Sequence, residues 1–203
     1  MQLRPSYPLR TARLTLRPLT VRDSAQLLSY RGRADVCRYL PFEPMDEPGL
    51  AARLAGGLGR REITAEGQAL TLGAELVASG RLVGDVVLFF HSAKHGAGEI
   101  GYVFHPEIAG RGYATEACAA VLNLAFDDRS GLGLHRVVAR MDARNRSSAR
   151  LAVRLGMRRK AHHRSSEMFK GAWADTVIYA LLADEWHARH GPAVDTGARP
   201  TRG

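Results

Sequence analysis

The stretch that decides the fold is Val103-Phe104-His105-Pro106-Glu107-Ile108-Ala109-Gly110-Arg111-Gly112-Tyr113-Ala114-Thr115. Its pattern predicts a strand that ends at Phe104, a loop through Pro106, and a helix that opens on glycines. The first turn of a helix has N–H groups without intrahelical partners, and the helix dipole places partial positive charge there. Glycines let the backbone approach a phosphate closely, and Arg111 adds a formal charge. The sequence therefore predicts an anion site at residues 110–115.

A Gly-x-Gly pair before a helix also occurs as a tight turn that binds no ligand, so the pair alone is weak evidence for an anion site. Thr115 stands where a dinucleotide-binding fingerprint has its third glycine, and the Lys-Ser/Thr pair of nucleotide hydrolases is missing. The stretch is therefore neither a Rossmann cofactor site nor a nucleotide hydrolase site.

The rest of the chain is an alternation of strand and helix patterns around this stretch. Alternating or continuous apolar runs predict strands at residues 14–19, 69–78, 82–90, 99–104, 136–141 and 173–182. Apolar residues spaced by three and four predict helices at residues 21–30, 50–58, 114–125 and 147–155, the second weakened by Gly56 and Gly57. The resulting fold class is α/β, with about seven strands and four helices.

The composition is that of one globular domain. The chain has 203 residues, 45% of them hydrophobic and 24% charged, and it lacks an apolar run of membrane-spanning length or a signal-peptide pattern. We expect a soluble, cytoplasmic protein with an N-terminal extension at residues 1–12, a domain at residues 13–186 and a disordered tail at residues 187–203.

The formal net charge is +9, and positive charge is concentrated between residues 136 and 170. Aromatic residues do not alternate with this charge, so we expect no specific nucleic acid partner; a polyanionic ligand or an acidic protein surface fits equally well. The two cysteines, Cys37 and Cys118, match no metal or redox motif, and we expect no metal.

Several motifs resemble, in their order along the chain, those of the GNAT acetyltransferases. They are Glu99-Ile100-Gly101-Tyr102, Gly110-Arg111-Gly112-Tyr113-Ala114-Thr115-Glu116-Ala117, Asn145-Arg146-Ser147-Ser148, Leu155-Gly156-Met157 and Ala183-Asp184-Glu185-Trp186. Together with Arg13-Leu14-Thr15-Leu16-Arg17-Pro18-Leu19, they look most like the branch that acetylates ribosomal-protein N-termini, the RimJ/RimL type. The resemblance covers residues 13–186, and its specificity lies in the order of the motifs.

The resemblance implies a GNAT fold, a mixed and mostly antiparallel sheet in which the strands at residues 99–104 and 136–141 splay apart. Acetyl-CoA is the implied co-substrate, with its pantetheine arm between these strands and its pyrophosphate on the glycine loop. The implied cofactor-binding residues are Tyr102, Val103, Phe104, Gly110, Arg111, Gly112, Tyr113, Ala114, Thr115, Asn145 and Ser148. Asn145 is equally suited to cap the helix that follows it.

Two positions depart from the pattern of the superfamily. Ala109 stands where the phosphate loop usually begins with Gln or Arg, which removes a side chain but no backbone donor. Ala152 stands where many members carry the tyrosine that protonates the leaving thiolate. By resemblance to the RimJ/RimL type, Ser148 is the candidate acid, and the alternative is an ordinary residue at a helix start.

Glu99 is the candidate general base, because it lies close to the implied pantetheine-binding stretch and an attacking amine must lose a proton. A structural, ion-paired carboxylate is the alternative, and Glu75, Asp85 and Asp175 remain open. The expected reaction is direct attack by the amine through a tetrahedral intermediate, without an acyl-enzyme.

The expected acceptor is a primary amine, first of all the α-amine of a protein or peptide. The alternatives are a small amine such as an antibiotic or polyamine, transfer of another acyl group such as succinyl, and a non-catalytic acyl-CoA sensor. The basic run at residues 158–164 suggests an acidic partner or a solvated strand edge. The resemblance also allows a homodimer.

Overall fold

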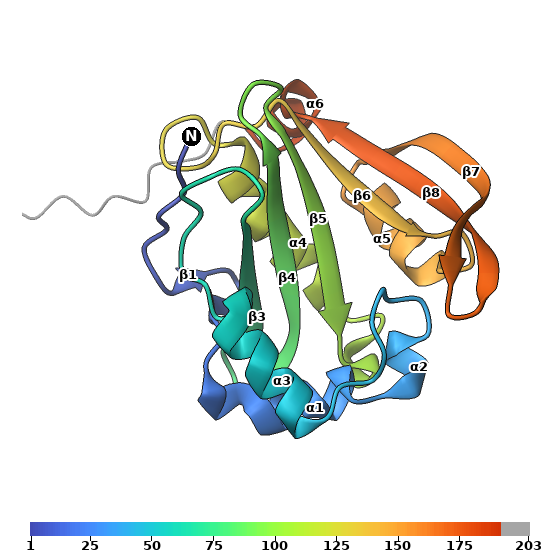
Figure 1. The fold of residues 1–203 in the computed structure, drawn as a ribbon. Coiled ribbons are helices and arrows are strands. Elements are labelled where there is room, and N and C mark those ends of the chain that lie inside the picture. Colours follow the sequence, from blue (N-terminus) through green and yellow to red (C-terminus); the bar gives the residue numbers. More distant parts are fainter. Residues whose placement is uncertain (192–203) are drawn as a thin grey trace, which may run out of the picture.

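The computed structural model describes residues 1–191, and one twisted sheet of eight strands runs through them (Figure 1). Its spatial order is β1-β2-β3-β4-β5-β6-β8-β7. The strands are β1 (Leu9–Arg10), β2 (Leu14–Pro18), β3 (Ala69–Leu76), β4 (Leu82–Ser92), β5 (Ala97–Phe104), β6 (Arg136–Asp142), β7 (Arg158–Phe169) and β8 (Ala172–Leu182). All neighbours are antiparallel except β5 and β6.

The parallel pair is where the sheet opens. β5 and β6 pair only at residues 97–99 with residues 136–138, and the last pair joins Glu99 to Val138. Beyond it the two strands diverge, as Figure 1 shows. From Ile100 onward the edge of β5 that faces β6 has no strand partner, so the predicted splay is confirmed.

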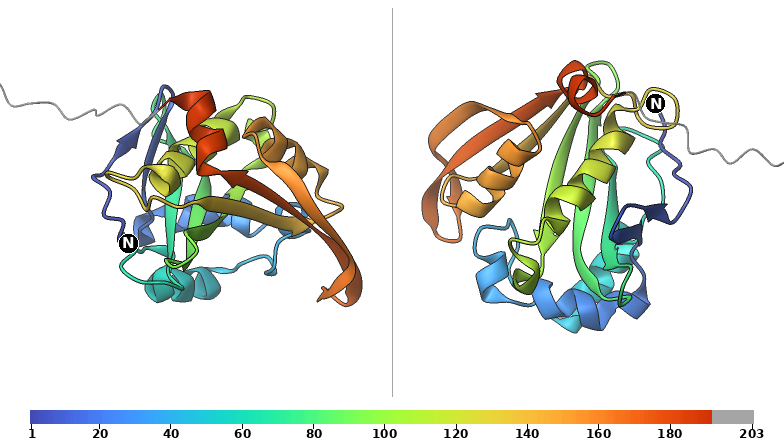
Figure 2. Two further views of the ribbon diagram at one scale, coloured as in Figure 1. Left: turned by 90° about the horizontal axis from the view of Figure 1, so that it is seen from above. Right: turned by 180° about the vertical axis from the view of Figure 1, so that it is seen from behind.

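Helices cover both faces of the sheet. They are α1 (Ser24–Arg31), α2 (Ala34–Cys37), α3 (Glu47–Arg53), α4 (Tyr113–Phe126), α5 (Arg146–Arg154) and α6 (Ala183–His190), with short turns η1 (Val21–Asp23), η2 (Leu54–Leu58) and η3 (Pro106–Ile108). Seen from behind in Figure 2, α4 and α5 lie on one face, whereas α1 and α3 lie on the other. No helix of residues 1–191 is both long enough and apolar enough to span a bilayer.

The alternation of side chains along the strands separates two apolar clusters. On the α4 face, Leu72, Leu88 and Ile100 share a core with the apolar stripe of α4, which includes Cys118 and Val121. On the other face, residues of β4 and β5 pack with α1 and α3; this cluster is Leu19, Leu27, Tyr30, Leu50, Leu54, Leu82 and Val103. At the opening of the sheet, β5 is thus packed on both faces.

The predicted fold class is confirmed: the described residues contain eight strands where about seven are expected, and β1 and β7 lie outside the predicted ranges. Two other expectations need correction. α6 extends to His190, so residues 187–190 are helical and only the rest of the expected tail, residues 192–203, lies outside the described residues. The expected N-terminal extension is part of the domain, because Leu3 is buried and bridged to Ile63, and β1 pairs with β2.

The predicted weakening of the helix at Gly56 and Gly57 is confirmed, because the α-helix ends before these residues. Asp46 caps α3 by accepting the N–H of Gly49 with its carboxylate, and α3 runs into the π-helical turn η2. Gly57 in this turn has a φ of 133°, a conformation that side-chain-bearing residues rarely adopt. The chain therefore turns away here and forms the wall of a pocket described below.

Candidate active site

The glycine loop lies exposed at the start of α4. Gly110 has a φ of 78°, and Gly112 caps α4 in the left-handed region with a φ of 81°. No atom lies within 4 Å of the position that a side chain on Gly110 would take. The loop before α4 therefore has open space beside Gly110, and an anion site at the start of the helix needs such space.

Arg13 holds this loop in place. Its Nη1 donates to the Arg111 carbonyl at 3.0 Å, and its guanidinium lies 4.5 Å from the centre of the Tyr113 ring. Its backbone N–H and Nε each donate to the Glu116 carboxylate at 2.7 Å, and the Thr11 hydroxyl donates at 2.6 Å. Burial raises the pKa of Glu116, but these hydrogen bonds and the Arg13 charge outweigh it and leave the pKa below its usual value.

A second cation reaches the same helix end from α5. Arg154 Nε lies 3.4 Å from Thr115 Oγ1, in the first turn of α4, and the Arg154 side chain is exposed. The sequence did not single out Arg154, because its only signal was a basic residue in the last turn of a short helix. The packing of α5 against α4 gives it a position beside the candidate phosphate site.

Tyr102, Asn145 and Ser148 come together at the start of α5. The Tyr102 hydroxyl donates to the Ser148 carbonyl at 3.1 Å, and the Ser148 N–H donates to Asn145 Oδ1 at 3.1 Å. Asn145 therefore caps α5, as its alternative role required. Burial raises the pKa of Tyr102 well above its usual value, so the phenol stays protonated. The Ser148 side chain is half-buried, and its hydroxyl lies close enough to the Tyr102 phenol to oppose part of this rise in pKa.

Val103 and Phe104 continue β5 beside the opening, but their side chains point elsewhere. The Val103 side chain is buried in the cluster under α1 and α3, and the Phe104 ring lies over Gly84 of β4. Only their backbone groups can line the edge that faces β6, which is the role that the resemblance implies for them.

Glu99 lies at the point where the strands part. Its carboxylate is 3.2 Å from His91 Nε2 and 3.8 Å from Arg140 Nε, and its side chain is 21% exposed. The expected alternative, an ion-paired carboxylate, is therefore partly realised. The partial exposure still leaves the carboxylate within reach of a molecule in the opening.

The other candidate bases are more tightly engaged. Asp85 is fully buried and accepts from Arg31 at 2.5 and 2.9 Å and from the Tyr30 hydroxyl at 2.7 Å. Glu75 accepts from Arg17 on the neighbouring strand at 2.8 Å. Asp175 lies in the β7–β8 hairpin, 2.8 Å from His162 Nε2. Among the four carboxylates, Glu99 alone lies on β5 at the split.

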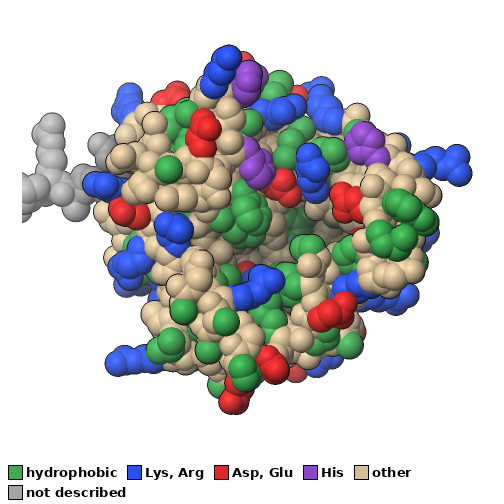
Figure 3. All heavy atoms as spheres, viewed as in Figure 1, with side chains coloured by type: hydrophobic (Ala, Val, Ile, Leu, Met, Phe, Trp, Pro, Cys, Tyr) green, Lys and Arg blue, Asp and Glu red, His purple; other side chains and the backbone are tan. Residues whose placement is uncertain are grey.

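A pocket of about 650 Å³ lies on the sheet face that carries Glu99. Val87 and Phe89 line it, and they pair across β4 and β5 with Gly101 and Glu99. Cross-strand partners point to the same face, so the pocket floor and the Glu99 carboxylate are neighbours. Figure 3 shows this face hollowed near its middle, with hydrophobic side chains inside and Lys and Arg side chains around it.

No group of three or more His, Cys, Asp or Glu side chains that could hold a metal ion occurs within residues 1–191.

A sheet split at a parallel pair, with a glycine-opened helix beside the split, is the arrangement that the resemblance to acyl-CoA-dependent N-acyltransferases implies. The family model of the acetyltransferase (GNAT) domain matches residues 13–158, well over half of the chain. The chain therefore belongs to the GNAT acetyltransferases, and acetyl-CoA is the co-substrate of that family.

Individual relatives agree with this family. The chain is 29% identical to an uncharacterised N-acetyltransferase of Bacillus subtilis, YnaD, over 87% of this chain and 98% of the relative. It is 28% identical to the [ribosomal protein uS5]-alanine N-acetyltransferase of Escherichia coli, over 90% of this chain and 94% of the relative. A solved GNAT-family acetyltransferase from Bacillus anthracis matches with a TM-score of 0.76 and 26% identity, over 87% of this chain and 99% of that one.

Proposed function

We propose that this enzyme transfers an acetyl group from acetyl-CoA to the α-amine of a protein or peptide. The observation that carries the proposal is the opening between β5 and β6 beside the glycine-capped end of α4. The choice of a protein α-amine is supported by the Escherichia coli relative, whose name states an alanine N-acetyltransferase of ribosomal protein uS5.

The residues of the opening fit the parts of coenzyme A. The free edge of β5 offers backbone groups at Tyr102, Val103 and Phe104 to the amide-bearing pantetheine arm. The first-turn N–H groups of residues 112–115, with Arg111, face the pyrophosphate. Arg154 adds a second cation that the sequence pattern did not indicate.

Acyl transfer requires proton movement at two atoms. A C–N bond forms as the thioester C–S bond breaks, the amine nitrogen gives up a proton, and the sulfur receives one. Glu99 is proposed to take the amine proton, directly or through a water molecule. It lies where β5 and β6 begin to diverge, on the sheet face that carries the pocket. Ser148 is proposed to donate toward the sulfur, since its half-buried side chain lies at the start of α5 beside Tyr102 of β5.

A thiol-release assay with acetyl-CoA tests this function against its alternatives. The acceptors are a peptide with a free α-amine, the same peptide with a blocked N-terminus, an aminoglycoside and spermidine, and succinyl-CoA is a second donor. We expect thiol release with the free peptide and a mass increase of one acetyl group on its first residue. Release only with the small amines, or only with succinyl-CoA, would overturn the proposal, and no release with any pair would favour a non-catalytic sensor.

A further inference from the structure

The pocket beside Glu99 carries positive charge that its own lining does not offset. Three arginines line it, Arg31, Arg53 and Arg60, and none of its lining residues is acidic. The Arg31 charge is balanced by Asp85, which it contacts through Nε and Nη2. Arg53 and Arg60 form no ion pair with an acidic residue in the part of the chain that the structure describes. Two positive charges are thus left for a ligand.

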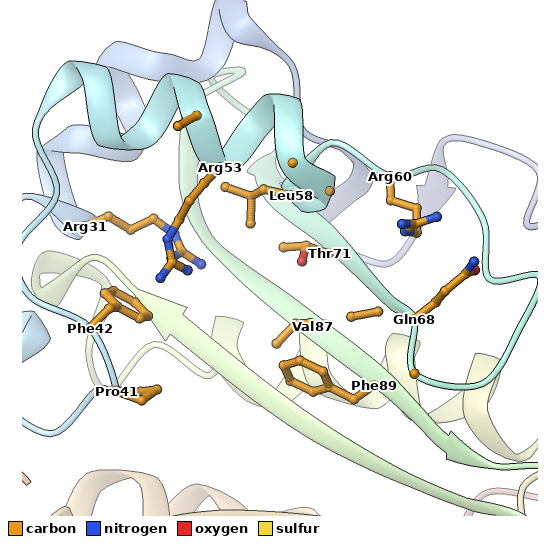
Figure 4. A pocket seen from close by; sticks show the side chains of 15 residues that line it. Arg31, Pro41, Phe42, Arg53, Leu58, Arg60, Gln68, Thr71, Val87 and Phe89 are labelled. Carbon is orange, nitrogen blue, oxygen red and sulfur yellow. The ribbon is translucent and has the colours of Figure 1, made fainter.

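The two free arginines stand at opposite ends of an apolar floor. Figure 4 shows Arg53 reaching toward Phe42 at one end and Arg60 beside Gln68 at the other, with Val87 and Phe89 between them. The Arg53 guanidinium lies 5.0 Å from the centre of the Phe42 ring. Stacking of this kind orients a guanidinium while leaving its N–H groups free for a carboxylate.

The segment between α2 and α3, which carries Phe42, is held in place by the β7–β8 hairpin. Lys170, at the tip of the β7–β8 hairpin, donates to the carbonyls of Cys37 and Phe42 at 2.9 and 3.1 Å and lies 3.3 Å from Glu43. The Lys170 charge is therefore engaged in holding the α2–α3 segment. The aromatic ring under Arg53 keeps its place without a ligand.

The charges are close to the proposed chemistry. Phe89 on the floor of the pocket is the cross-strand partner of Glu99, and adjacent strands lie about 4.8 Å apart. An acceptor whose amine reaches Glu99 would therefore lay its next groups over the floor, toward Arg53 or Arg60. A carboxylate there gains charge-assisted hydrogen bonds from the arginine it reaches, whereas a second ammonium group is repelled.

We infer that this pocket selects peptide α-amines that are followed within the first few residues by an acidic side chain, and that it discriminates against polycationic amines. The inference deepens the proposed function and rests on it. It also differs from the expectation that residues 158–164 recognise an acidic partner, because these residues lie on the exposed edge strand β7 and do not line the pocket.

Two peptides that share an N-terminal alanine and carry either Asp-Asp or Lys-Lys next test the inference, with spermidine as a polycationic amine. The variants are Arg53→Gln and Arg60→Gln. The matched control is Arg159→Gln, an exposed arginine on β7 outside the pocket. Circular dichroism checks that each variant is folded.

For the wild type we expect kcat/KM to be higher for the acidic peptide than for the lysine peptide, and higher than for spermidine. Each pocket variant should lower the value for the acidic peptide about tenfold, the low end for a lost charge-assisted contact in a solvent-accessible site. The lysine peptide should be unaffected or improved, and Arg159→Gln should behave as wild type. Raising the salt concentration should shrink the preference.

Equal rates for the two peptides, or a preference that survives both pocket variants, would overturn the inference while leaving the proposed function standing. A preference that disappears in Arg159→Gln would instead assign recognition to β7. If no peptide is acetylated, the proposed function fails, and calorimetric binding of the two peptides in the presence of coenzyme A decides the inference. Tighter binding of the acidic peptide, lost in the pocket variants, supports it, and equal binding overturns it.

Discussion

Gly112→Ala is the change that most sharply probes the helix end as a phosphate site. Gly112 caps α4 with a φ of 81°, and residues with a Cβ pay about 1–2 kcal/mol to occupy this left-handed region. The added Cβ would also lie 3.3 Å from Arg13 Nη2, which must shift slightly. Because the loop is exposed, the free protein can relax away from this conformation.

The bound state cannot relax in the same way, since the first-turn N–H groups must keep pointing at the ligand. The strain therefore falls on binding, and about 1–2 kcal/mol corresponds to a roughly 5- to 30-fold higher Kd for acetyl-CoA. Isothermal titration calorimetry measures this directly, with the melting temperature recorded in parallel.

Gly80→Ala is the matched control. Gly80 lies in the β3–β4 hairpin with a φ of 67°, and no atom lies within 4 Å of its missing side chain. It should lose stability for the same backbone reason and keep the wild-type Kd. A Gly112→Ala variant that binds acetyl-CoA within twofold of wild type would refute the reasoning, as would an equal loss of affinity in Gly80→Ala.

Three further substitutions test the proton-handling residues and the support of the loop. Glu99→Gln should lower kcat/KM roughly 10²-fold in the thiol-release assay, the usual effect of losing a general base, with the Kd for acetyl-CoA unchanged; full activity would remove Glu99 from the mechanism. Ser148→Ala should lower kcat at least about tenfold, within the range for a lost proton donor. The control is Ser147→Ala, which changes the exposed neighbouring serine and should keep the wild-type kcat. Equal kcat values for the two variants would exclude Ser148 as the proton donor.

Glu116→Gln should lower the free energy of unfolding at pH 7 by about 1 kcal/mol, because the hydrogen bonds are charge-assisted but partly screened. Since the pKa of Glu116 is lowered in the folded state, its contribution is complete above the ordinary value of 4.5 and is lost as the pH falls below it. The wild type and the variant should therefore converge in urea titrations at acid pH, and a constant difference would contradict this.

Local signals explain which parts of the fold the sequence revealed. The glycines before α4 and its apolar spacing of three and four residues are short-range features, so the loop and the helix could be predicted. β7 could be anticipated only as the solvated-edge alternative for residues 158–164, because its residues are mostly exposed and polar and it forms a strand by pairing with β8. Strand formation there depends on a partner and not on propensity.

In the candidate site, too, short-range motifs could be predicted from the sequence, whereas contacts between distant residues could not. The motifs around Gly112 and Tyr102 could be recognised, and the structure brings Tyr102 and Ser148 into contact across 46 positions of the chain. The supporting role of Arg13 and the position of Arg154 depend on contacts that no pattern in the sequence records. The net positive charge of the pocket likewise depends on which of its arginines form ion pairs, and only the folded structure determines those pairs. The catalytic roles of Glu99 and Ser148 stay predictions.

The most direct test of the central claim is a crystal structure of the protein with coenzyme A. The account predicts that the pantetheine arm lies between β5 and β6, with the pyrophosphate at residues 110–115 and the sulfur near Glu99 and Ser148. A second cationic site among the described residues is the pocket of Arg53 and Arg60. Coenzyme A bound there, with the β5–β6 opening empty, would contradict both the cofactor assignment and the proposed acceptor pocket.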